Sequence, residues 1–446
     1  MSDAASAADG ISGATAAEIA ESVRALIERG ALAPGDALPP VRALADRLGV
    51  NRNTATAAYR LLQTAGLVAS AGRGGTRVAE VPDVAREGYA PHRDGLVDVG
   101  NGNPDPSRIP PLAGVLEASV GGPVLYGAPV VEPGLEEWAT AWMAPDAAPE
   151  EIRISVTNGA SDAIERLLTA SLSRGDAVAI EDPGFLSGIH AIRVGGFDAI
   201  GVPVDAEGMT PDGLRAVIAA GARAVIGTPR AQNPTGASVS ARRADELRSV
   251  LAEHPYLLVI EDDHFSLLSR RPFHSMAPAG HHRYALVRSV SKFLGPDMSL
   301  ALVASDTHTA ERIGMRLRRG TAWVSHLLQR LSLALLTDEA ALATIADAGA
   351  HYADRNVAFC ARLAAAGIAC EPGDGLNVWV PVPDGRAAAE RLRGSGWVVR
   401  PGDAFRVDSA GRDDGASGAD RIRVTVHALT DAQQAQLAEA IADASR

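Results

Sequence analysis

The stretch SVSKFLGPDMSLALVASD, residues 289–306, contains Lys292, which is the only lysine of the chain. Lysine and arginine together number 42, so the other 41 basic side chains are arginine. A composition rich in alanine, glycine and arginine indicates a GC-rich genome, which explains why lysine is rare but not why one remains here. Because a guanidinium stays protonated, arginine replaces lysine as a surface charge but not as a reactive amine. The stretch therefore predicts amine chemistry at Lys292, with a cofactor nearby.

The length and composition of the chain predict a globular protein with two or three domains. It has 446 residues, of which 46% are apolar and 22% charged. No run of about 18 apolar residues predicts a membrane span, and the acidic N-terminus lacks a signal pattern. Cys360 and Cys370 have no metal-ligand spacing, so we interpret them as two buried thiols. We expect a cytoplasmic protein without a metal site.

Positive charge is concentrated near the N-terminus, although the whole chain carries a net charge of −12. Residues 40–79 contain one acidic residue, Asp46, and six arginines. Such a local excess within an acidic protein indicates that this segment meets a polyanion. The six are Arg42, Arg47, Arg52, Arg60, Arg73 and Arg77.

Residues 17–68 predict three helices, and a hairpin follows them. AEIAESVRALIERGAL (17–32) places Ile19, Val23, Ile27 and Leu32 at helical spacing. VRALADRLGV (41–50) predicts a second helix that ends at a glycine, and NRNTATAAYRLLQTAGLV (51–68) predicts a third, capped by an asparagine. LVASAGRGGTRVAE (67–80) alternates around glycines, which predicts a small β-hairpin.

This segment resembles the GntR-type winged helix-turn-helix. The matching stretches are GALAPGDALPPVRALA (30–45), LGVNRNT (48–54), AYRLL (58–62) and GGTRV (74–78). The resemblance implies that the third helix enters the major groove of DNA. It also implies that phosphates and base edges are contacted by Arg42, Arg52, Asn53 and Thr54, and by Arg73 and Gly74 at the tip of the wing.

Residues 81–97 contain prolines and charges of both signs and show no periodicity, which predicts a linker. Beyond it, strand-like runs alternate with helical ones, which predicts an α/β body with a mainly parallel sheet. Four runs end in polar residues: AVAIED (177–182), AVIGTP (224–229), LLVIEDD (257–263) and ALVRSVSK (285–292). Because ligands collect at the carboxyl ends of parallel strands, the side chains that follow these runs are candidate site residues.

The requirements of pyridoxal 5′-phosphate match these residues one by one. Its aldehyde needs an amine for a Schiff base, which Lys292 provides, and its pyridine nitrogen needs a carboxylate, for which Asp262 is placed. Phe185 can stack on the ring, and Asn233 can donate to the ring hydroxyl. TNGASDAIERLL (157–168) opens a helix after a glycine, so its N-terminus is suited to the phosphate. The phosphate contacts would come from Ala160, Ser161 and Ser289.

The body resembles a fold-type I aminotransferase, and the whole chain resembles the MocR subfamily of GntR regulators. Ten stretches carry this resemblance in family order: GNPDPSRIP (102–110), YGAP (126–129), TNGASDAI (157–164), EDPGF (181–185), TPRAQNPTG (228–236), IEDDHF (260–265), SVSKFLGP (289–296), WVSHLLQ (323–329), RPGDAF (400–405) and RIRVTVH (421–427). The resemblance implies that Arg423 grips a substrate carboxylate. It also implies a homodimer in which Tyr126 reaches the partner subunit's cofactor phosphate.

The chain departs from the family pattern at four positions. Ser299 stands where an arginine usually neutralises the phosphate, which would weaken cofactor binding by roughly 1.5–3 kcal/mol unless another arginine, such as Arg230, takes its place. His264 stands where a tyrosine often contacts the ring oxygen and could substitute as a donor. Ala301 and Val131 each replace a common glycine.

These patterns predict a winged helix-turn-helix at residues 12–80, a linker at 81–97 and an aminotransferase-like body at 98–446. A smaller α+β C-terminal part is expected at about 326–446. The leading hypothesis is a transcriptional regulator that binds operator DNA and senses pyridoxal phosphate, an amino acid or an amine. Two alternatives remain open: an active aminotransferase with a fused DNA-binding head, and a regulator that has lost the cofactor.

Overall fold

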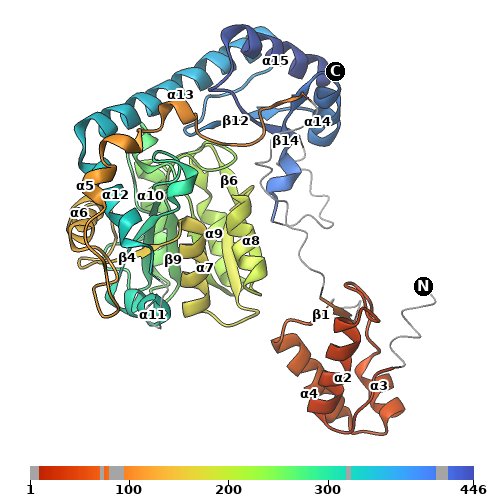
Figure 1. Cartoon of the computed structure of the whole chain (residues 1–446). Helices are drawn as coiled ribbons and strands as arrows, with labels where there is room; N and C mark the ends of the chain where they lie inside the picture. The colour runs from red at the N-terminus through yellow and green to blue at the C-terminus, as the bar shows by residue number, and fades with distance from the viewer. Residues whose placement is uncertain (1–9, 71–74, 80–94, 318–322, 408–419) are drawn as a thin grey trace. The chain divides into compact units, whose positions relative to one another are not determined.

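The computed structural model describes residues 10–70, 75–79, 95–317, 323–407 and 420–446. The chain forms two compact units, which divide between Val84 and Ala85 (Figure 1). We call them the head and the body, and each is described by itself. None of the helices in the described ranges is long and apolar enough to cross a membrane.

The head consists of three helices and a hairpin, as predicted. Its elements are α2 (Ala16–Glu28), α3 (Val41–Leu48), α4 (Arg52–Thr64), β1 (Val68–Ser70) and β2 (Thr76–Val78). Gly49 ends α3 in the left-handed conformation, at φ 65°. The Asn51 side chain then caps α4 by accepting a hydrogen bond from the Asn53 N–H at 2.8 Å. This tight turn between two helices confirms the winged helix-turn-helix.

The helices of the head enclose one apolar core. Ile19 and Val23 are buried, as their spacing predicts, but the third buried position of α2 is Leu26, whereas Ile27 is only partly covered. Tyr59 is buried too, and its hydroxyl donates to the Pro39 carbonyl at 2.7 Å. Burial raises the pKa of Tyr59 to about 12. This contact fixes α4 against the loop before α3.

The body is built on one eight-stranded sheet with the order β4-β11-β10-β9-β8-β5-β6-β7. The strands from β10 to β6 are parallel to one another, and β11 runs antiparallel between β10 and β4. This arrangement confirms the α/β class and the mainly parallel sheet. The strands are β4 (Arg153–Thr157), β5 (Ala177–Asp182), β6 (Asp198–Asp205), β7 (Gly208–Met209), β8 (Ala222–Gly227), β9 (Leu258–Asp262), β10 (Tyr284–Ser289) and β11 (Ala301–Ser305).

Helices cover both faces of this sheet, which is why its central strands are apolar on both sides. One core contains residues of α7 (Ala160–Ser171), α8 (Leu186–Val194) and α11 (Thr307–Leu317). The other contains residues of α6 (Pro133–Met143), α9 (Pro211–Ala219), α10 (Ala241–Ala252), α12 (His326–Thr337) and α13 (Glu339–Ala365). On β10, Leu286 packs in the second core and Val287 in the first.

A smaller α+β part has its own sheet, in the order β12-β15-β14. Its elements are β12 (Asn377–Pro381), α14 (Gly385–Gly394), β13 (Trp397–Val398), β14 (Arg400–Pro401), β15 (Arg421–Thr425) and α15 (Asp431–Ala444), with the second half of α13. The strand β3 (Val97–Asp98), from the start of the body, pairs in parallel with β13. The chain after β3 is thereby held beside the smaller sheet. Short helical turns and one further helix complete the body: η2 (Pro106–Arg108), η3 (Leu112–Gly114), α5 (Leu116–Ser119), η4 (Ser266–Leu268), η5 (Pro296–Met298) and η6 (Gly402–Phe405).

A buried ion-pair network lies just beyond the end of β9. Asp263 is fully buried and accepts from Arg230 at 2.6 Å and from Arg288 at 2.8 Å. Although burial opposes ionisation, the two guanidinium groups hold the pKa of Asp263 below its usual value. Arg230 is thus paired with Asp263. It does not take the place of the phosphate-binding arginine expected at position 299, for which the sequence had made it a candidate.

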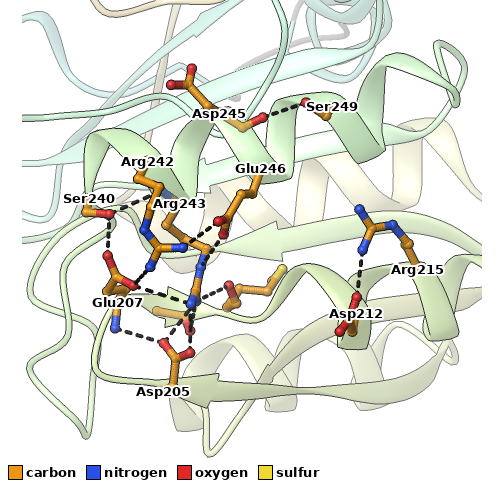
Figure 2. A network of polar contacts seen from close by, with 12 residues as sticks. Asp205, Glu207, Asp212, Arg215, Ser240, Arg242, Arg243, Asp245, Glu246 and Ser249 are labelled. Atoms are coloured by element: carbon orange, nitrogen blue, oxygen red, sulfur yellow. Dashed lines mark hydrogen bonds and ion pairs between the residues drawn. The ribbon is translucent and has the colours of Figure 1, made fainter.

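A second network holds the start of α10 (Figure 2). Arg243 is buried and donates to both carboxylate oxygens of Asp205, at 2.9 and 2.7 Å. Ser240 caps α10 and also donates to Glu207 at 2.5 Å. The turn between β6 and β7 is therefore fastened to α10. The loop that leads into α10 carries Asn233, and this network fixes its far end.

Candidate cofactor site and nucleic-acid interface

Lys292 lies in the turn after β10, three residues beyond the end of the strand. Its ammonium group donates to the Gly102 carbonyl at 2.8 Å. Ser289, at the end of the strand, is buried, and its hydroxyl lies 3.2 Å from both the amide nitrogen and the hydroxyl of Ser291. This local bonding shapes the turn that presents Lys292 to the pocket described below.

Asp262, the last residue of β9, is buried with one of its two carboxylate oxygens unsatisfied among the described residues. Its side chain is 3% exposed, and within the described ranges its Oδ1 atom has no hydrogen-bond partner. Burial, together with the charges of Asp263 and Glu181, raises the pKa of Asp262 to about 7. A buried carboxyl of this kind is suited to accept a hydrogen bond from a cationic ligand atom.

Two further buried acids, Glu181 and the strand neighbour Glu261, have hydrogen-bond partners. Glu181 accepts from the Thr228 N–H at 3.1 Å and from the Gln232 amide at 3.2 Å. Glu261 accepts from Ser275, among others. Burial raises the pKa of Glu181 and of Glu261 to about 7. No group of three or more His, Cys, Asp or Glu side chains in the described ranges is placed to hold a metal ion.

Arg423 and Asn233 form a direct contact. Arg423 is fully buried on β15, and it donates to the Asn233 side-chain oxygen at 2.9 Å and to the Gly100 carbonyl at 2.7 Å. Its guanidinium lies over the Phe405 ring, 4.8 Å from the centroid. The arginine expected at a substrate carboxylate is therefore engaged with the residue expected at the ring hydroxyl.

The rings of Phe185 and His264 are nearly parallel. Their planes differ by 10° and their centroids lie 6.1 Å apart. A flat ring between two others needs about 7 Å, because each stacked contact takes roughly 3.5 Å. The 6.1 Å between the two centroids is about 1 Å shorter than this, so the rings would have to move apart to enclose a third ring. His264 therefore presents a ring face as well as the donor group that the sequence suggested.

The start of α7 meets Ser299. The N-cap Gly159 has φ 85°, and no side chain caps this helix. The Ser299 hydroxyl donates to the Asn158 carbonyl at 3.5 Å, and a Cβ on Gly159 would lie 3.7 Å from it. The first-turn N–H groups, including those of Ala160 and Ser161, have no partners within the helix and suit an anion. Ser299 thus lies at the place where the phosphate is expected.

Tyr126 lies outside this group, with 76% of its surface exposed. Its ring packs edge-on against Trp323 at 5.6 Å. The YGAP and WVSHLLQ stretches therefore lie together, and His326 bonds the Pro129 carbonyl at 2.9 Å.

In the head, the residues expected at DNA lie on the turn and at the start of α4. Arg42, on α3, is exposed, as are Arg52 and Asn53. Thr54 is partly covered. Arg73 and Gly74 lie outside the described residues. Three of the described candidates thus share the start of α4, the expected recognition helix, and Arg42 lies at the start of α3.

Three of the predicted cofactor residues line one pocket: Asn233, His264 and Lys292. The sequence had not assigned a role to residues 100–103, which contribute carbonyls to both Arg423 and Lys292. A signal existed in the glycines of GNGNP, because Gly102 has φ 69° and a Cβ there would approach Arg423 to 3.2 Å. Phe405 is the last residue of the RPGDAF stretch (400–405). The sequence pattern did not indicate that its ring packs against the Arg423 guanidinium.

Comparisons with known proteins agree with both units. Residues 116–441 match the family Aminotransferase class I and II, and residues 15–78 match the bacterial regulatory proteins of the gntR family. The vitamin B6 salvage pathway transcriptional repressor PtsJ of Salmonella typhimurium (strain LT2) is 47% identical over 425 residues, 95% of this chain and 96% of that protein. The pyridoxine biosynthesis transcriptional regulator PdxR of Corynebacterium glutamicum is 28% identical over 326 residues, 66% of each. The multiple substrate aminotransferase of Thermococcus profundus has a TM-score of 0.70 at 20% identity, covering 83% of this chain and 95% of its own.

A winged helix-turn-helix joined to an aminotransferase fold defines a two-part class of transcriptional regulators. The chain belongs to the GntR family of bacterial regulatory proteins, in the MocR-type form that carries an aminotransferase class I and II domain.

Replacing Asp262 by asparagine is expected to stabilise the body, and increasingly so as pH rises. The folded pKa of about 7 lies above the unfolded value of about 3.9, so the native state binds the proton more tightly. The resulting stability is complete below the unfolded pKa and is lost as pH rises through 7, at about 1.4 kcal/mol per pH unit. Asparagine does not titrate, so the advantage of Asp262→Asn grows between about pH 4 and pH 7.

Urea unfolding measures this difference through tryptophan fluorescence, since all 5 tryptophans lie in the body. Asp245→Asn, on the exposed side of α10, is the matched control and should show no such growth. If the free energies of unfolding of Asp262→Asn and of the unmodified protein differ by the same amount at every pH, the raised pKa of Asp262 is contradicted.

Proposed function

We propose that this regulator controls transcription in response to pyridoxal phosphate bound in its body. The observation that carries the proposal joins two residues. The only lysine lines a pocket, and on the neighbouring strand lies a buried carboxyl with an oxygen that no described residue partners. Lysine is the side chain needed to hold an aldehyde covalently. An unpartnered buried acid is the side chain needed to keep a pyridine nitrogen protonated.

The residues of the site fit this cofactor. When bound, pyridoxal phosphate supplies an aldehyde that condenses with primary amines. Lys292 would hold that aldehyde, and Asp262 would accept from the ring nitrogen. Phe185 and His264 would enclose the ring, as their nearly parallel planes support. Ala160, Ser161, Ser289 and Ser299 would receive the phosphate, and Asn233 would donate to the ring hydroxyl after exchanging its contact with Arg423.

The names of the relatives support a role in vitamin B6 metabolism. PtsJ is named as a repressor of the vitamin B6 salvage pathway, and PdxR as a regulator of pyridoxine biosynthesis. We infer that this chain regulates genes of the same metabolism, with repression as the expected sign. Pyridoxal phosphate is the chemical form that reports the state of such a pathway to the site described above.

DNA binding belongs to the head. Arg42, Arg52, Asn53 and Thr54, with Arg73 and Gly74 on the wing, would contact the duplex. Exposure of Arg42 at the start of α3 and of Arg52 and Asn53 at the start of α4 supports this assignment. The arginines would neutralise phosphates, so binding falls as salt rises.

The same proposal makes the protein a homodimer. An exposed apolar strip runs through residues 112–126, where Leu125 is 74% and Tyr126 is 76% exposed. Leu112, Leu116 and Val120 also expose between 39% and 55% of their surface. A second copy that covers this strip would bring Tyr126 toward the neighbour's cofactor phosphate. Sedimentation at micromolar concentration should give a dimer, and Tyr126→Ala with Leu125→Ser should weaken it; a monomer of the unmodified protein would refute this arrangement.

An amino compound is a second ligand that the site supports. Arg423 is buried, and its guanidinium can donate two parallel hydrogen bonds, which is the geometry that suits a carboxylate. Its present partners, Asn233 and Gly100, must be exchanged before it binds one. We therefore assign amino-acid recognition to the loaded protein, with amino-group transfer secondary to regulation.

The central test compares operator binding by the unmodified protein, Lys292→Ala and Lys292→Arg. The DNA is the genomic fragment selected by the purified protein, titrated with and without pyridoxal phosphate. The unmodified protein should change its operator affinity by a few-fold to about a hundred-fold, the range of ordinary allosteric coupling. Both variants should lack this response, since arginine keeps the charge but not the amine chemistry.

Arg52→Ala serves as the control for the head and should lose roughly 1–3 kcal/mol of specific binding while keeping the cofactor. Reduction with borohydride should trap the cofactor on the peptide that contains Lys292. If the unmodified protein, Lys292→Ala and Lys292→Arg bind the operator with the same affinity with and without pyridoxal phosphate, then pyridoxal phosphate is not the signal.

Introducing arginine at Ser299 should tighten pyridoxal phosphate binding. Ser299 adjoins the start of α7, and a charge-assisted bond to the phosphate contributes about 1.5–3 kcal/mol, or roughly ten-fold to a hundred-fold in affinity. Absorbance titration of Ser299→Arg measures the change. Ser249→Arg, on the exposed face of α10, adds the same charge elsewhere and should leave affinity unchanged. Equal affinities for Ser299→Arg and Ser249→Arg would show that the phosphate does not lie at Ser299.

A further inference from the structure

The only two cysteines of the chain are in contact. Cys360 lies on α13, and Cys370 lies in the loop before β12. Their sulfur atoms are 3.5 Å apart, with the Cys360 thiol donating to the Cys370 sulfur. A disulfide has a sulfur–sulfur distance of about 2.05 Å, so the two atoms need to approach by only about 1.5 Å. The sequence predicted two buried thiols, but Cys370 is only half-buried.

The two thiols differ in chemical character. The hydrogen bond from Cys360 lowers the pKa of the Cys370 thiol, and the nearby Arg421 lowers it further, while burial and Glu371 oppose the shift. The same contact raises the pKa of Cys360, which keeps the shared proton. Since the thiolate is the reactive form, Cys370 is the nucleophile of the pair.

Cys370 is accessible to small molecules, whereas Cys360 is covered. Cys370 borders an open cleft of about 760 Å³ between the NPTG loop (residues 233–236) and the smaller part of the body. Trp379 and Arg421 also line this cleft. Cys360 is 4% exposed and packs in the core of the smaller part. A small oxidant therefore meets Cys370 first, and Cys360 lies directly behind it. This is the arrangement of an attacking and a resolving cysteine.

We propose that Cys360 and Cys370 form an oxidation site that peroxides convert into an intramolecular disulfide. The Cys370 thiolate attacks one peroxide oxygen, the O–O bond breaks, and the product is a sulfenic acid with hydroxide as leaving group. The Cys360 sulfur then attacks the Cys370 sulfur, the S–O bond breaks, and water leaves with the Cys360 proton. The two sulfurs together lose two electrons, which reduce one peroxide. A dithiol returns the pair to its starting state.

The loop after Cys370 connects this site to the cofactor pocket. Gly373 packs on Gly236 of the NPTG stretch so closely that a Cβ on Gly373 would lie 2.7 Å from the Gly236 Cα. The Asp374 N–H donates to the Gly236 carbonyl at 2.8 Å, and Asp374 and Gly375 line the pocket with Lys292.

On the other side, Asn356 of α13 holds the Gly375 carbonyl at 2.9 Å. Drawing Cys370 toward Cys360 therefore displaces a loop that is fastened at both the helix and the pocket. This coupling rests on the proposed cofactor function, whereas the oxidation itself does not.

The chemistry is tested on the full-length protein. It is treated with hydrogen peroxide, quenched with iodoacetamide and weighed intact. The expected product has lost about 2 Da, takes up no alkyl group and reverts with dithiothreitol. Cys360→Ser should instead give a dimedone adduct at Cys370, and Cys370→Ser should resist the same treatment. Two alkylated cysteines, a disulfide between chains, or over-oxidised Cys370 as the sole product would each overturn the proposal.

The coupling has a separate measurement. Pyridoxal phosphate is titrated by absorbance into reduced and oxidised protein, with the Cys360→Ser, Cys370→Ser double variant as control. Oxidation should change the dissociation constant at least three-fold in the unmodified protein and not in the double variant. A disulfide that leaves the constant unchanged would refute the coupling. A reduced protein that does not bind the cofactor would refute the proposed function, while the mass measurement would still decide the oxidation site.

Discussion

Two consecutive buried aspartates lie at the end of β9, and they differ in their hydrogen-bond partners. Asp263 is surrounded by Arg230 and Arg288, while Asp262 receives no hydrogen bond at Oδ1 within the described residues. Removing one partner of a buried ion pair typically costs about 3–5 kcal/mol, so the pairing of Asp263 constrains β8, β9 and β10 together. That constraint fixes the strand ends, and the fixed strand ends allow Asp262 to remain unsatisfied. Burying Asp262 with Oδ1 unsatisfied costs free energy. A cationic ligand atom that donates a hydrogen bond to this oxygen would reduce that cost.

The same constraint explains why the site residues come from segments far apart in the chain. Parallel strands end at one edge of the sheet, so the residues that follow β5, β8, β9 and β10 meet there. The smaller part contributes Arg423, and residues 100–103 contribute carbonyls to both Arg423 and Lys292. Lys292 and Arg423 are held by these carbonyls, whereas Asp262 keeps an Oδ1 atom without a partner among the described residues. A ligand would have to replace the contact between Arg423 and Asn233 and the bonds that Arg423 and Lys292 make to these carbonyls.

The sequence predicted the elements and the strand ends because both are local properties. Helical spacing located α2, and the glycine and asparagine at the turn located the start of α4; the parallel rhythm placed Lys292 and Asn233 near one another. It did not predict the partners of the charged residues. Arg230 could be matched to a phosphate or to an acid, and only the packed structure shows that it pairs with Asp263, 33 residues away. The Cys360–Cys370 contact was equally invisible, because a spacing of ten residues does not specify the path of the chain after α13.

Ser299 distinguishes a site built for sensing from one built for continuous catalysis. An enzyme gains from a cofactor that never leaves, and a phosphate arginine serves that end. A regulator responds to ligand concentration only if its dissociation constant lies near the concentrations that vary, because a saturated site reports nothing. Loss of one charge-assisted phosphate contact raises a dissociation constant by roughly ten-fold to a hundred-fold. In the proposed function, Lys292, Asp262 and the two rings would make recognition specific, and Ser299 in place of an arginine would keep the cofactor exchangeable.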